Sequence, residues 1–361
     1  MSNVKSIYIH IPFCNQICTY CDFCKLYYNK KWINKYLEAL KQEVRLSYKN
    51  EKISTVYIGG GTPSSLTIEE LTKLFCITNN ILLEEDYEFT IECNIEDITE
   101  EKLIIFKKNK VNRLSIGVQS FNKEILNYLG RNYDESIILK KINLAKKYFK
   151  NINIDLIYAI KNQTLDDLNM EIEKFLSINV PHISCYSLII ENNTILKNNK
   201  EEYINDELDR KMYDLICNKL GKKYNHYEIS NFSINGYESK HNLCYWNNLE
   251  YYGFGLSASG YINDIRYTNT KNLSKYLKCD FDKDKEILNK QDKMQYELIV
   301  GFRKIDGINK LDFYNKYNMN LKDLYNIKDL ISKNILLENK YFIYINPKYI
   351  YTSNDILVNF I

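Results

Sequence analysis

The sequence predicts an α/β fold: an incomplete, six-unit (βα)6 barrel of the TIM type, followed by a small α+β C-terminal domain that resembles a winged helix. Three observations predict it. Apolar runs rich in β-branched residues alternate with segments of helical period six times between residue 6 and about residue 221. These runs are largely apolar on both faces, which is typical of buried parallel strands. The last stretch, from residue 291, has the pattern of helices followed by a hairpin.

The elements follow in order from the first apolar run, SIYIHI, which alternates as a strand does. The next segment places an apolar stripe on one helical face, formed by Trp32, Tyr36, Leu37, Leu40 and Val44. The run STVYIGGGTP is then β-rich and ends in glycines. The alternation continues through LTKLFCITNNIL, YEFTIEC, EEKLIIFKKN, NRLSIGV, SIILKKINLAKKYF, INIDLIY, LDDLNMEIEKFL and HISCYSLII. Six strand-and-helix units with right-handed crossovers make an incomplete version of the eight-unit barrel.

We expect three parts along the chain. Residues 1–230 form the barrel, and residues 231–290 form a loop-rich connecting segment with short strands that carries the motif HNLCYW. Residues 291–361 form the C-terminal helical and hairpin domain. This last part has no evident basic recognition face, so a packing role is favoured over nucleic-acid recognition.

The composition excludes several classes of protein. With 361 residues, 45% of them hydrophobic, the chain can build a core without disulfide staples. The formal net charge of +3 is not gathered into a basic stripe, which argues against nucleic acid as a partner. The sequence shows no apolar signal region and no apolar run of membrane-spanning length, so we expect a cytoplasmic protein. Asparagine is abundant, and we expect it at turns where glycine or proline is usual.

Four of the ten cysteines cluster in FCNQICTYCDFCK. A disulfide framework conflicts with the expected reducing compartment, a structural zinc site lacks a second Cys/His pair downstream, and c-type haem attachment needs a histidine where Lys25 stands. The Cys-x3-Cys-x2-Cys spacing of Cys14, Cys18 and Cys21 instead favours three thiolates on three irons of a 4Fe-4S cluster whose fourth iron stays open. The spacing alone leaves the part played by Cys24 undecided.

Polar or glycine residues stand where the predicted strands end, and in a barrel of this type chemistry occurs at those ends. Cys14 follows the first strand, residues 59–62 end the second, Glu92 ends the third, Gln119 ends the fourth and Asp155 lies in the fifth. The GGGTP segment fits a simple tight turn as well as a place where the backbone approaches a ligand. The two carboxylates could also be purely structural.

The cysteine segment resembles the cluster loop of the radical S-adenosylmethionine (SAM) superfamily. Together with YIHIPFC it is similar to one branch, the anaerobic coproporphyrinogen III oxidases and the related haem chaperones. The motifs YIGGGTPSSLT, TIECN, NRLSIGVQSFNKEILNYLGR, NIDLIYAIKNQT, HISCYSL, YEISNF and HNLCYW follow in the order of that family. The resemblance implies a radical SAM barrel in which SAM binds the open iron and is cleaved to a 5′-deoxyadenosyl radical. It also implies that Cys24 is not a ligand, because a fourth thiolate would close that iron.

Site residues are carried over from the family by motif. The resemblance implies that cluster-bound SAM is held by Tyr8, Gly60, Gly61, Thr62 and Glu92. It implies a second SAM site, known from the oxidase branch, at Tyr20, Gln119, Arg131 and Asp155. His10 is expected to orient the cysteine loop. The chain departs from the family pattern at Ala159, Ile160, Lys161 and Asn162, which replace Gly-Leu-Pro-Gly, so substrate handling differs more than cluster binding.

Two functions of different class compete. The oxidase branch carries an N-terminal extension and a Gly-Cys pair where this chain has Asp22 and Phe23, so the resemblance favours a haem chaperone over an oxidase that decarboxylates coproporphyrinogen III. In HNLCYW the resemblance implies His241 as an axial haem ligand, with flat faces from Tyr245 and Trp246. A lone histidine beside aromatic rings is more often a hydrogen-bonded packing residue. The implied partners are a haem acceptor protein, with a peripheral membrane acceptor as one option, and an electron donor such as a flavodoxin or ferredoxin.

Overall fold

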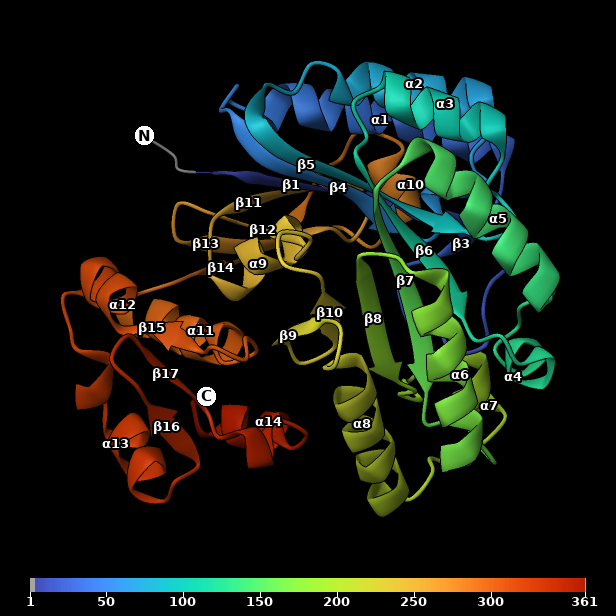
Figure 1. Ribbon diagram of the computed structural model, residues 1–361. Helices are drawn as coiled ribbons and strands as arrows, with labels where there is room; N and C mark the ends of the chain where they lie inside the picture. The colour runs from blue at the N-terminus through green and yellow to red at the C-terminus, as the bar shows by residue number, and fades with distance from the viewer. Residues whose placement is uncertain (1–3, 361) are drawn as a thin grey trace.

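The computed structural model describes residues 4–360 of the chain. Its main feature is one twelve-stranded sheet with the order β14-β13-β12-β11-β1-β4-β5-β6-β7-β8-β10-β9 (Figure 1). Residues 1–3 and residue 361, at the outer ends of the first and third predicted parts, lie outside the described residues.

Six neighbouring strands of this sheet form the barrel. They pair in parallel throughout, from β1 to β4 and on to β8. The strands are β1 (Ser6–Ile11), β4 (Ile53–Gly60), β5 (Leu83–Asn94), β6 (Arg113–Gln119), β7 (Asn151–Tyr158) and β8 (His182–Ser187). Each is followed by at least one helix, so the predicted six-unit α/β barrel is confirmed.

The helices that return the chain lie on the outside of the sheet, with α1, α2 and α3 side by side (Figure 1). They are α1 (Lys30–Ser47), α2 (Ile68–Thr78), α3 (Glu100–Lys108), α4 (Lys123–Tyr128), α5 (Glu135–Tyr148), α6 (Leu165–Ile178), α7 (Ile195–Asn198) and α8 (Asp206–Leu220). The apolar stripe of α1 is buried as predicted, except that Trp32 is 42% exposed. Ile33 takes the buried position instead, because it aligns with Tyr36, Leu37 and Leu40 while Trp32 flanks the stripe.

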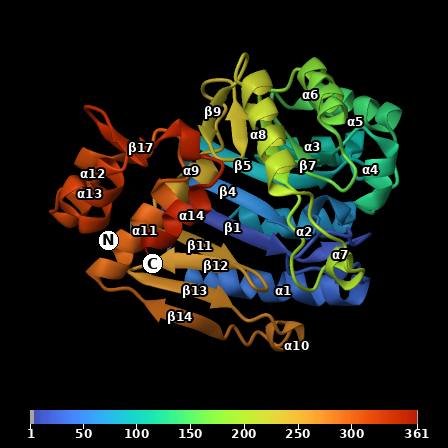
Figure 2. The same cartoon turned by 90° about the horizontal axis from the view of Figure 1, so that it is seen from below.

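The sheet continues beyond the barrel on both sides. Strand β11 (Tyr251–Phe254) pairs in parallel with β1 on the side away from β4, so β1 is an interior strand. Figure 2 shows the antiparallel strands that extend from it. They are β12 (Ser259–Ile262), β13 (Ile265–Asn269) and β14 (Lys283–Ile287). At the other edge lie β9 (Asn225–Glu228) and β10 (Asn231–Ser233).

The segment expected to connect two domains therefore adds strands to the barrel sheet. It also contains two helices, α9 (Lys240–Trp246) and α10 (Leu273–Tyr276). The short strands expected there are present, and they pair with the barrel. The three-part division at residues 230 and 290 stays a prediction.

The last part of the chain packs beside the barrel as a small α+β unit (Figures 1 and 2). Its helices are α11 (Lys290–Gly301), α12 (Lys310–Tyr317), α13 (Tyr325–Ser332) and α14 (Ser353–Leu357). A three-stranded sheet combines β15 (Ile308–Asn309), β17 (Phe342–Ile345) and β16 (Leu336–Glu338). Helices followed by an antiparallel hairpin match the winged-helix character that the sequence predicts. Among residues 4–360, no helix has the length and apolar character needed to cross a membrane.

Asparagine occurs at the ends of helices, in agreement with the expectation from the composition. It caps the first turn of α1, α4, α8 and α11, where the side chain of Asn29, Asn122, Asn205 or Asn289 accepts backbone N–H groups. Asn179 and Asn318 end helices in the left-handed conformation, at φ of 55° and 49°.

Candidate functional site

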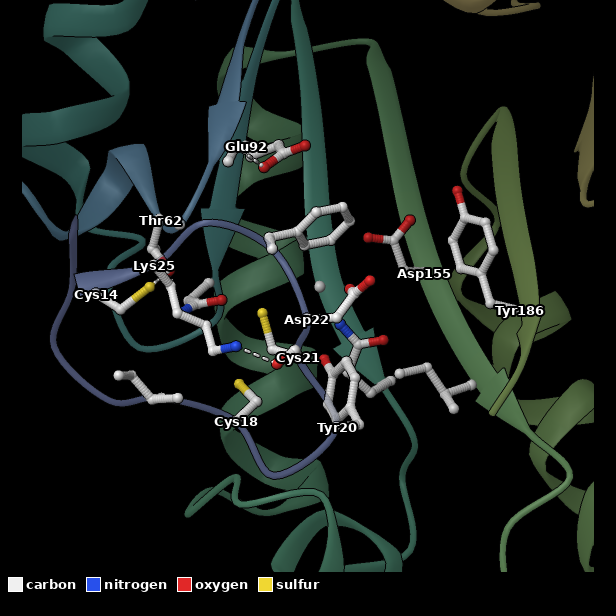
Figure 3. Close-up of a pocket in the computed structure, with 18 of the residues that line it drawn as sticks. Cys14, Cys18, Tyr20, Cys21, Asp22, Lys25, Thr62, Glu92, Asp155 and Tyr186 are labelled. Carbon is white, nitrogen blue, oxygen red and sulfur yellow. Dashed lines mark hydrogen bonds between the residues drawn. The ribbon is translucent and has the colours of Figure 1, made fainter. Parts of the chain in front are cut away.

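A cavity of about 410 Å³ opens at the carboxyl ends of the barrel strands (Figure 3). Most of the predicted site residues line it: Cys14, Cys18, Tyr20, Cys21, Gly60, Gly61, Thr62, Glu92, Gln119, Arg131 and Asp155. Tyr8 and His241 do not line it. The cysteines lie on the loop side of the cavity, and the two carboxylates lie on the barrel strands (Figure 3).

The cysteine loop is closed by a two-stranded parallel sheet. Strands β2 (Phe13–Cys14) and β3 (Leu26–Tyr27) pair on either side of the loop. Leu26 N donates to Pro12 O at 2.7 Å, and Tyr28 N donates to Cys14 O at 2.9 Å. The loop therefore starts and ends at one place on the barrel rim, which limits where its thiols can point.

Contacts from other elements fix the middle of this loop. The Thr19 hydroxyl donates to Tyr128 O at 2.8 Å, and Gln16 Nε2 donates to Gly130 O at 2.6 Å, both just at the end of α4. On the barrel side, His10 Nε2 lies 2.8 Å from Cys24 O, while His10 Nδ1 lies 2.9 Å from the Tyr8 hydroxyl. The expectation that His10 orients the loop is confirmed.

All four thiols of the loop are free. Cys14, Cys18 and Cys21 line the cavity, whereas Cys24 does not and packs partly buried against the core. Burial raises the pKa of the Cys14 thiol to about 11, and Thr62 Oγ1 lies 3.5 Å from its sulfur. Within residues 4–360, no three His, Cys, Asp or Glu side chains converge on a single metal ion. A cubane cluster instead takes each thiolate on a separate iron.

Close packing explains the glycines of GGGTP. Gly60 has φ of +114°, and a Cβ built there would lie 2.4 Å from the imidazole of His10. A Cβ at Gly59 would lie 2.7 Å from Glu92 Oε1, and one at Gly61 would lie 2.7 Å from the carbonyl of Pro12. The segment is thus both a tight turn and a wall of the cavity. Any side chain at these positions would displace the groups that shape the site.

Glu92 is held by two donors. The Tyr57 hydroxyl donates to Oε1 at 2.8 Å, and the Gly60 amide donates to Oε2 at 3.0 Å. Burial raises the pKa of Glu92 to about 7, against the lowering effect of these two hydrogen bonds, and the nearby Asp155 adds to the rise. The Glu92 carboxyl group therefore titrates near neutral pH.

Asp155 faces the same space from β7. Burial raises its pKa to about 6, although hydrogen bonds from Asn153 and Ser184 and the charges of Arg113 and Arg131 act against the rise. Asn153 Nδ2 donates to Asp155 Oδ1 at 2.7 Å.

Two buried polar side chains at the cavity have atoms without a protein partner. Arg131 donates from Nη1 to Asn94 Oδ1 at 2.7 Å and from Nη2 to the Tyr20 hydroxyl at 3.4 Å, but its Nε has no hydrogen-bond partner. The Oε1 atom of Gln119 also has none. Gln119 has φ of +69°, a strained conformation for a residue with a side chain. Unpaired polar atoms of this kind on a cavity wall are suited to a polar ligand.

His241 of α9 is buried, with 1% of its surface exposed, and both of its ring nitrogens are hydrogen-bonded. Nδ1 lies 2.8 Å from the Thr55 hydroxyl and Nε2 lies 2.7 Å from the Tyr245 hydroxyl. Burial lowers the pKa of His241 to about 3, with a smaller effect from Arg113. Its neighbour Trp246 is covered by Arg303, whose guanidinium lies 4.7 Å from the indole ring.

Comparisons with known proteins identify the family to which the chain belongs. The radical SAM superfamily matches residues 8–175. The chain is 41% identical over 310 residues to "Heme chaperone HemW" of Lactococcus lactis, covering 83% of this chain and 82% of that protein. The chain belongs to the HemW family of radical SAM proteins. "Heme chaperone HemW" of Bacillus subtilis is 38% identical, covering 83% of this chain and 84% of the relative.

One solved structure resembles the HemW-family chain over nearly its whole length. It is the coproporphyrinogen III oxidase HemN from Escherichia coli, described as a radical SAM enzyme, with a TM-score of 0.85. The likeness covers 99% of this chain and 90% of the other at 21% identity. It confirms the fold, including the C-terminal part, and carries no further conclusion.

Membership of the radical SAM superfamily implies a 4Fe-4S cluster and SAM, and the residues of this HemW-family chain fit both. Three free thiols open into one cavity, which satisfies the donor set of a cluster with an open iron. The unpaired atoms of Arg131 and Gln119 leave donor and acceptor capacity for a polar ligand beside it. Haem does not fit His241 in this conformation, because neither ring nitrogen is free and the residue lies outside the cavity.

Several lining residues were missed from the sequence. Tyr57, Asn94 and Tyr186 contribute polar groups, and Phe23 and Ile189 form an apolar edge, 64% and 57% exposed. Strand alternation could have found Tyr57, since it lies two residues before Gly59 on the same face. The same alternation marks Asn94, two residues after Glu92 on β5. No local pattern marks Phe23 or Ile189, because their place depends on how loops meet.

Proposed function

We propose that this chain is a radical SAM-type haem chaperone, which binds a 4Fe-4S cluster, SAM and haem and delivers haem to an acceptor protein. The observation that carries the proposal is the 41% identity, over most of both chains, to a relative named as a heme chaperone. The cavity with three cysteines at its wall supports the cluster and SAM parts.

The roles of the individual residues are part of the proposal. Cys14, Cys18 and Cys21 hold the cluster, and Tyr8, Gly60, Gly61, Thr62 and Glu92 hold SAM beside it. A second SAM molecule is assigned to Tyr20, Gln119, Arg131 and Asp155. When bound, the cluster and SAM together supply one-electron chemistry. The protein's own contribution is a cavity in which hydrogen bonds fix the cysteine loop, Gly60 and the Glu92 carboxylate.

Haem binding is the third part of the proposal. Ligation by His241, which the family resemblance implies, requires one ring nitrogen to give up its partner, Thr55 or Tyr245. The apolar edge of the cavity at Phe23 and Ile189 offers exposed surface of the kind that a porphyrin face covers. The acceptor, a flavodoxin- or ferredoxin-type electron donor and a cytoplasmic location belong to the same proposal.

The alternative is an oxidase that decarboxylates coproporphyrinogen III, since the chain shares the fold of HemN. A haem titration beside an anaerobic decarboxylation assay separates the two functions. The reconstituted protein, with reductant and SAM, should show a saturable Soret band and form no divinyl product, while an active oxidase serves as positive control in the same assay. Many turnovers to the divinyl product would replace the chaperone assignment with the oxidase.

A further inference from the structure

The imidazole of His241 is connected to the SAM cavity although it does not line it. Its ring stacks on the ring of Tyr57, with centroids 5.1 Å apart and planes 28° apart. Tyr57 lines the cavity, and its hydroxyl donates to Glu92 Oε1 at 2.8 Å. Only one side chain therefore separates the histidine of HNLCYW from a carboxylate of the site.

Strand register explains this arrangement. Tyr57 of β4 pairs with Tyr8 of β1 on one side and with Thr90 of β5 on the other, two residues before Glu92. The Tyr57 ring lies between two others, since the Tyr8 ring is 6.2 Å away and tilted by 31°. Gly59 leaves room for the phenol, because a Cβ there would lie 2.8 Å from the Tyr57 ring.

His241 is itself held rigidly. Hydrogen bonds at both ring nitrogens join it to β4 through Thr55 and to its own helix through Tyr245. The backbone amides of Lys240 and His241 donate to the buried carboxylate of Glu88 on β5, which fixes the start of α9 against the barrel. The stack on Tyr57 is thus a fixed surface against one face of the Tyr57 ring.

We propose that His241 is a positioning residue of the SAM site, whose imidazole holds the Tyr57 hydroxyl on the Glu92 carboxylate. The inference rests on the proposed role of Glu92 in SAM binding and assigns the histidine of HNLCYW to SAM rather than to axial ligation of haem. Removing the imidazole leaves a space beside Tyr57, so the phenol loses its fixed orientation and Glu92 loses one of its two donors. The cysteines stay in place, because no hydrogen bond of His241 reaches their loop.

The test compares SAM affinity of the reconstituted protein in three variants. Tyr57→Phe keeps the ring and removes only the hydroxyl, while His241→Ala removes the stack. His226→Ala is the matched control, since His226 also stacks on an aromatic ring, Phe232, at 4.3 Å, but on the edge strands β9 and β10. We expect Tyr57→Phe and His241→Ala each to weaken SAM binding about tenfold, with iron content unchanged and the control unaffected. The double variant should be no weaker than Tyr57→Phe alone.

A pH profile distinguishes positioning from general loosening. The Tyr57 hydroxyl lowers the pKa of Glu92, so losing it should move the pH midpoint of SAM binding upward in both variants and not in His226→Ala. The other titratable groups that interact with Glu92 are the hydroxyls of Tyr8 and Tyr245, the thiol of Cys93 and the carboxyl of Asp155. Neither substitution removes any of these side chains.

The outcomes separate this inference from the proposed function. Unchanged SAM affinity in His241→Ala, together with a lost Soret band, would overturn the inference and assign His241 to haem. Unchanged SAM affinity in Tyr57→Phe would also overturn it, because that substitution removes the hydrogen bond directly. A wild-type protein that binds no haem would refute the chaperone proposal, yet a tenfold loss of SAM affinity in the two variants would still support the positioning role.

Discussion

The backbone amide of Gly60 lies 3.0 Å from Glu92 Oε2, and this contact joins strands β4 and β5 at the rim that carries the cysteine loop. It depends on a glycine with φ of +114°, whose missing Cβ leaves space for the imidazole of His10. His10 in turn holds the carbonyl of Cys24. One backbone conformation therefore links the acidic group of the cavity to the cysteine loop.

Gly60→Ala should destabilise the protein by about 3 kcal/mol, since it combines a strained φ with overlap against His10. Iron content after reconstitution should fall with it, because His10 would be pushed away from Cys24. Gly236→Ala is the matched control: its φ is +86°, but no atom lies within 4 Å of the new Cβ, so about 1 kcal/mol is expected. Denaturant titrations measure both, and equal losses would show that overlap with His10 does not matter.

Anaerobic reconstitution should give one 4Fe-4S cluster per chain. Alanine at Cys14, Cys18 or Cys21 should abolish it, since each of these thiols lines the cavity, and alanine at Cys24 should leave it intact. Iron content and visible absorbance measure the result. Cys76→Ala is the control, because Cys76 is exposed and its loss should leave the cluster intact. Loss of the cluster in Cys24→Ala would contradict the three-cysteine assignment.

SAM should change the paramagnetic resonance spectrum of the reduced cluster, because one iron is left open for it. Glu92→Gln should require about tenfold more SAM for the same change above pH 7, where Glu92 is mostly ionised, since it replaces a charged acceptor in the cavity. Glu96→Gln, at a side chain outside the cavity, should titrate like the wild type. A spectrum that saturating SAM leaves unchanged, with the cluster intact, would mean that no iron is open.

The stability of the cofactor-free protein should depend on pH through Glu92. Its pKa is about 7 in the folded protein against 4.5 for the free side chain, so between these values the folded state binds the extra proton. The free energy of unfolding should then fall as pH rises from 4.5 to 7, by about 2 kcal/mol for this residue. Glu92→Gln should lack that part of the fall in urea titrations at pH 5 and pH 7.5. Identical pH dependence in the two proteins would contradict a raised pKa at Glu92.

Local patterns were sufficient to predict the barrel and part of the cavity wall. A β-branched strand and the polar residue at its end are adjacent in sequence, so Glu92 and Gln119 could be assigned to the rim without knowing how the strands pair. The cysteine spacing was equally local. The family resemblance added Arg131 and Tyr20, which lie on the cavity because the end of α4 meets the cysteine loop.

Long-range contacts could not be predicted in this way. No sequence pattern near Tyr251 indicates that β11 pairs with β1. The segment is predicted to be rich in loops because its strands are short and contain glycine. For His241 the sequence allowed both a ligand and a packing residue. Its ring is hydrogen-bonded to Thr55 of β4 and its backbone amide to the Glu88 carboxylate of β5, and both partners are more than 150 residues away.

The interior position of β1 has a consequence for biosynthesis. This strand leaves the ribosome before every other strand of its sheet, yet its partner β11 ends at Phe254, so one edge of β1 stays unpaired until that residue has been made. At about 5–20 residues per second, translation of the intervening chain takes tens of seconds or less. During that interval the loop with Cys14, Cys18 and Cys21 is attached to a strand with an open edge. A nascent chain halted before residue 251 should accordingly be more prone to aggregation than one halted after residue 290.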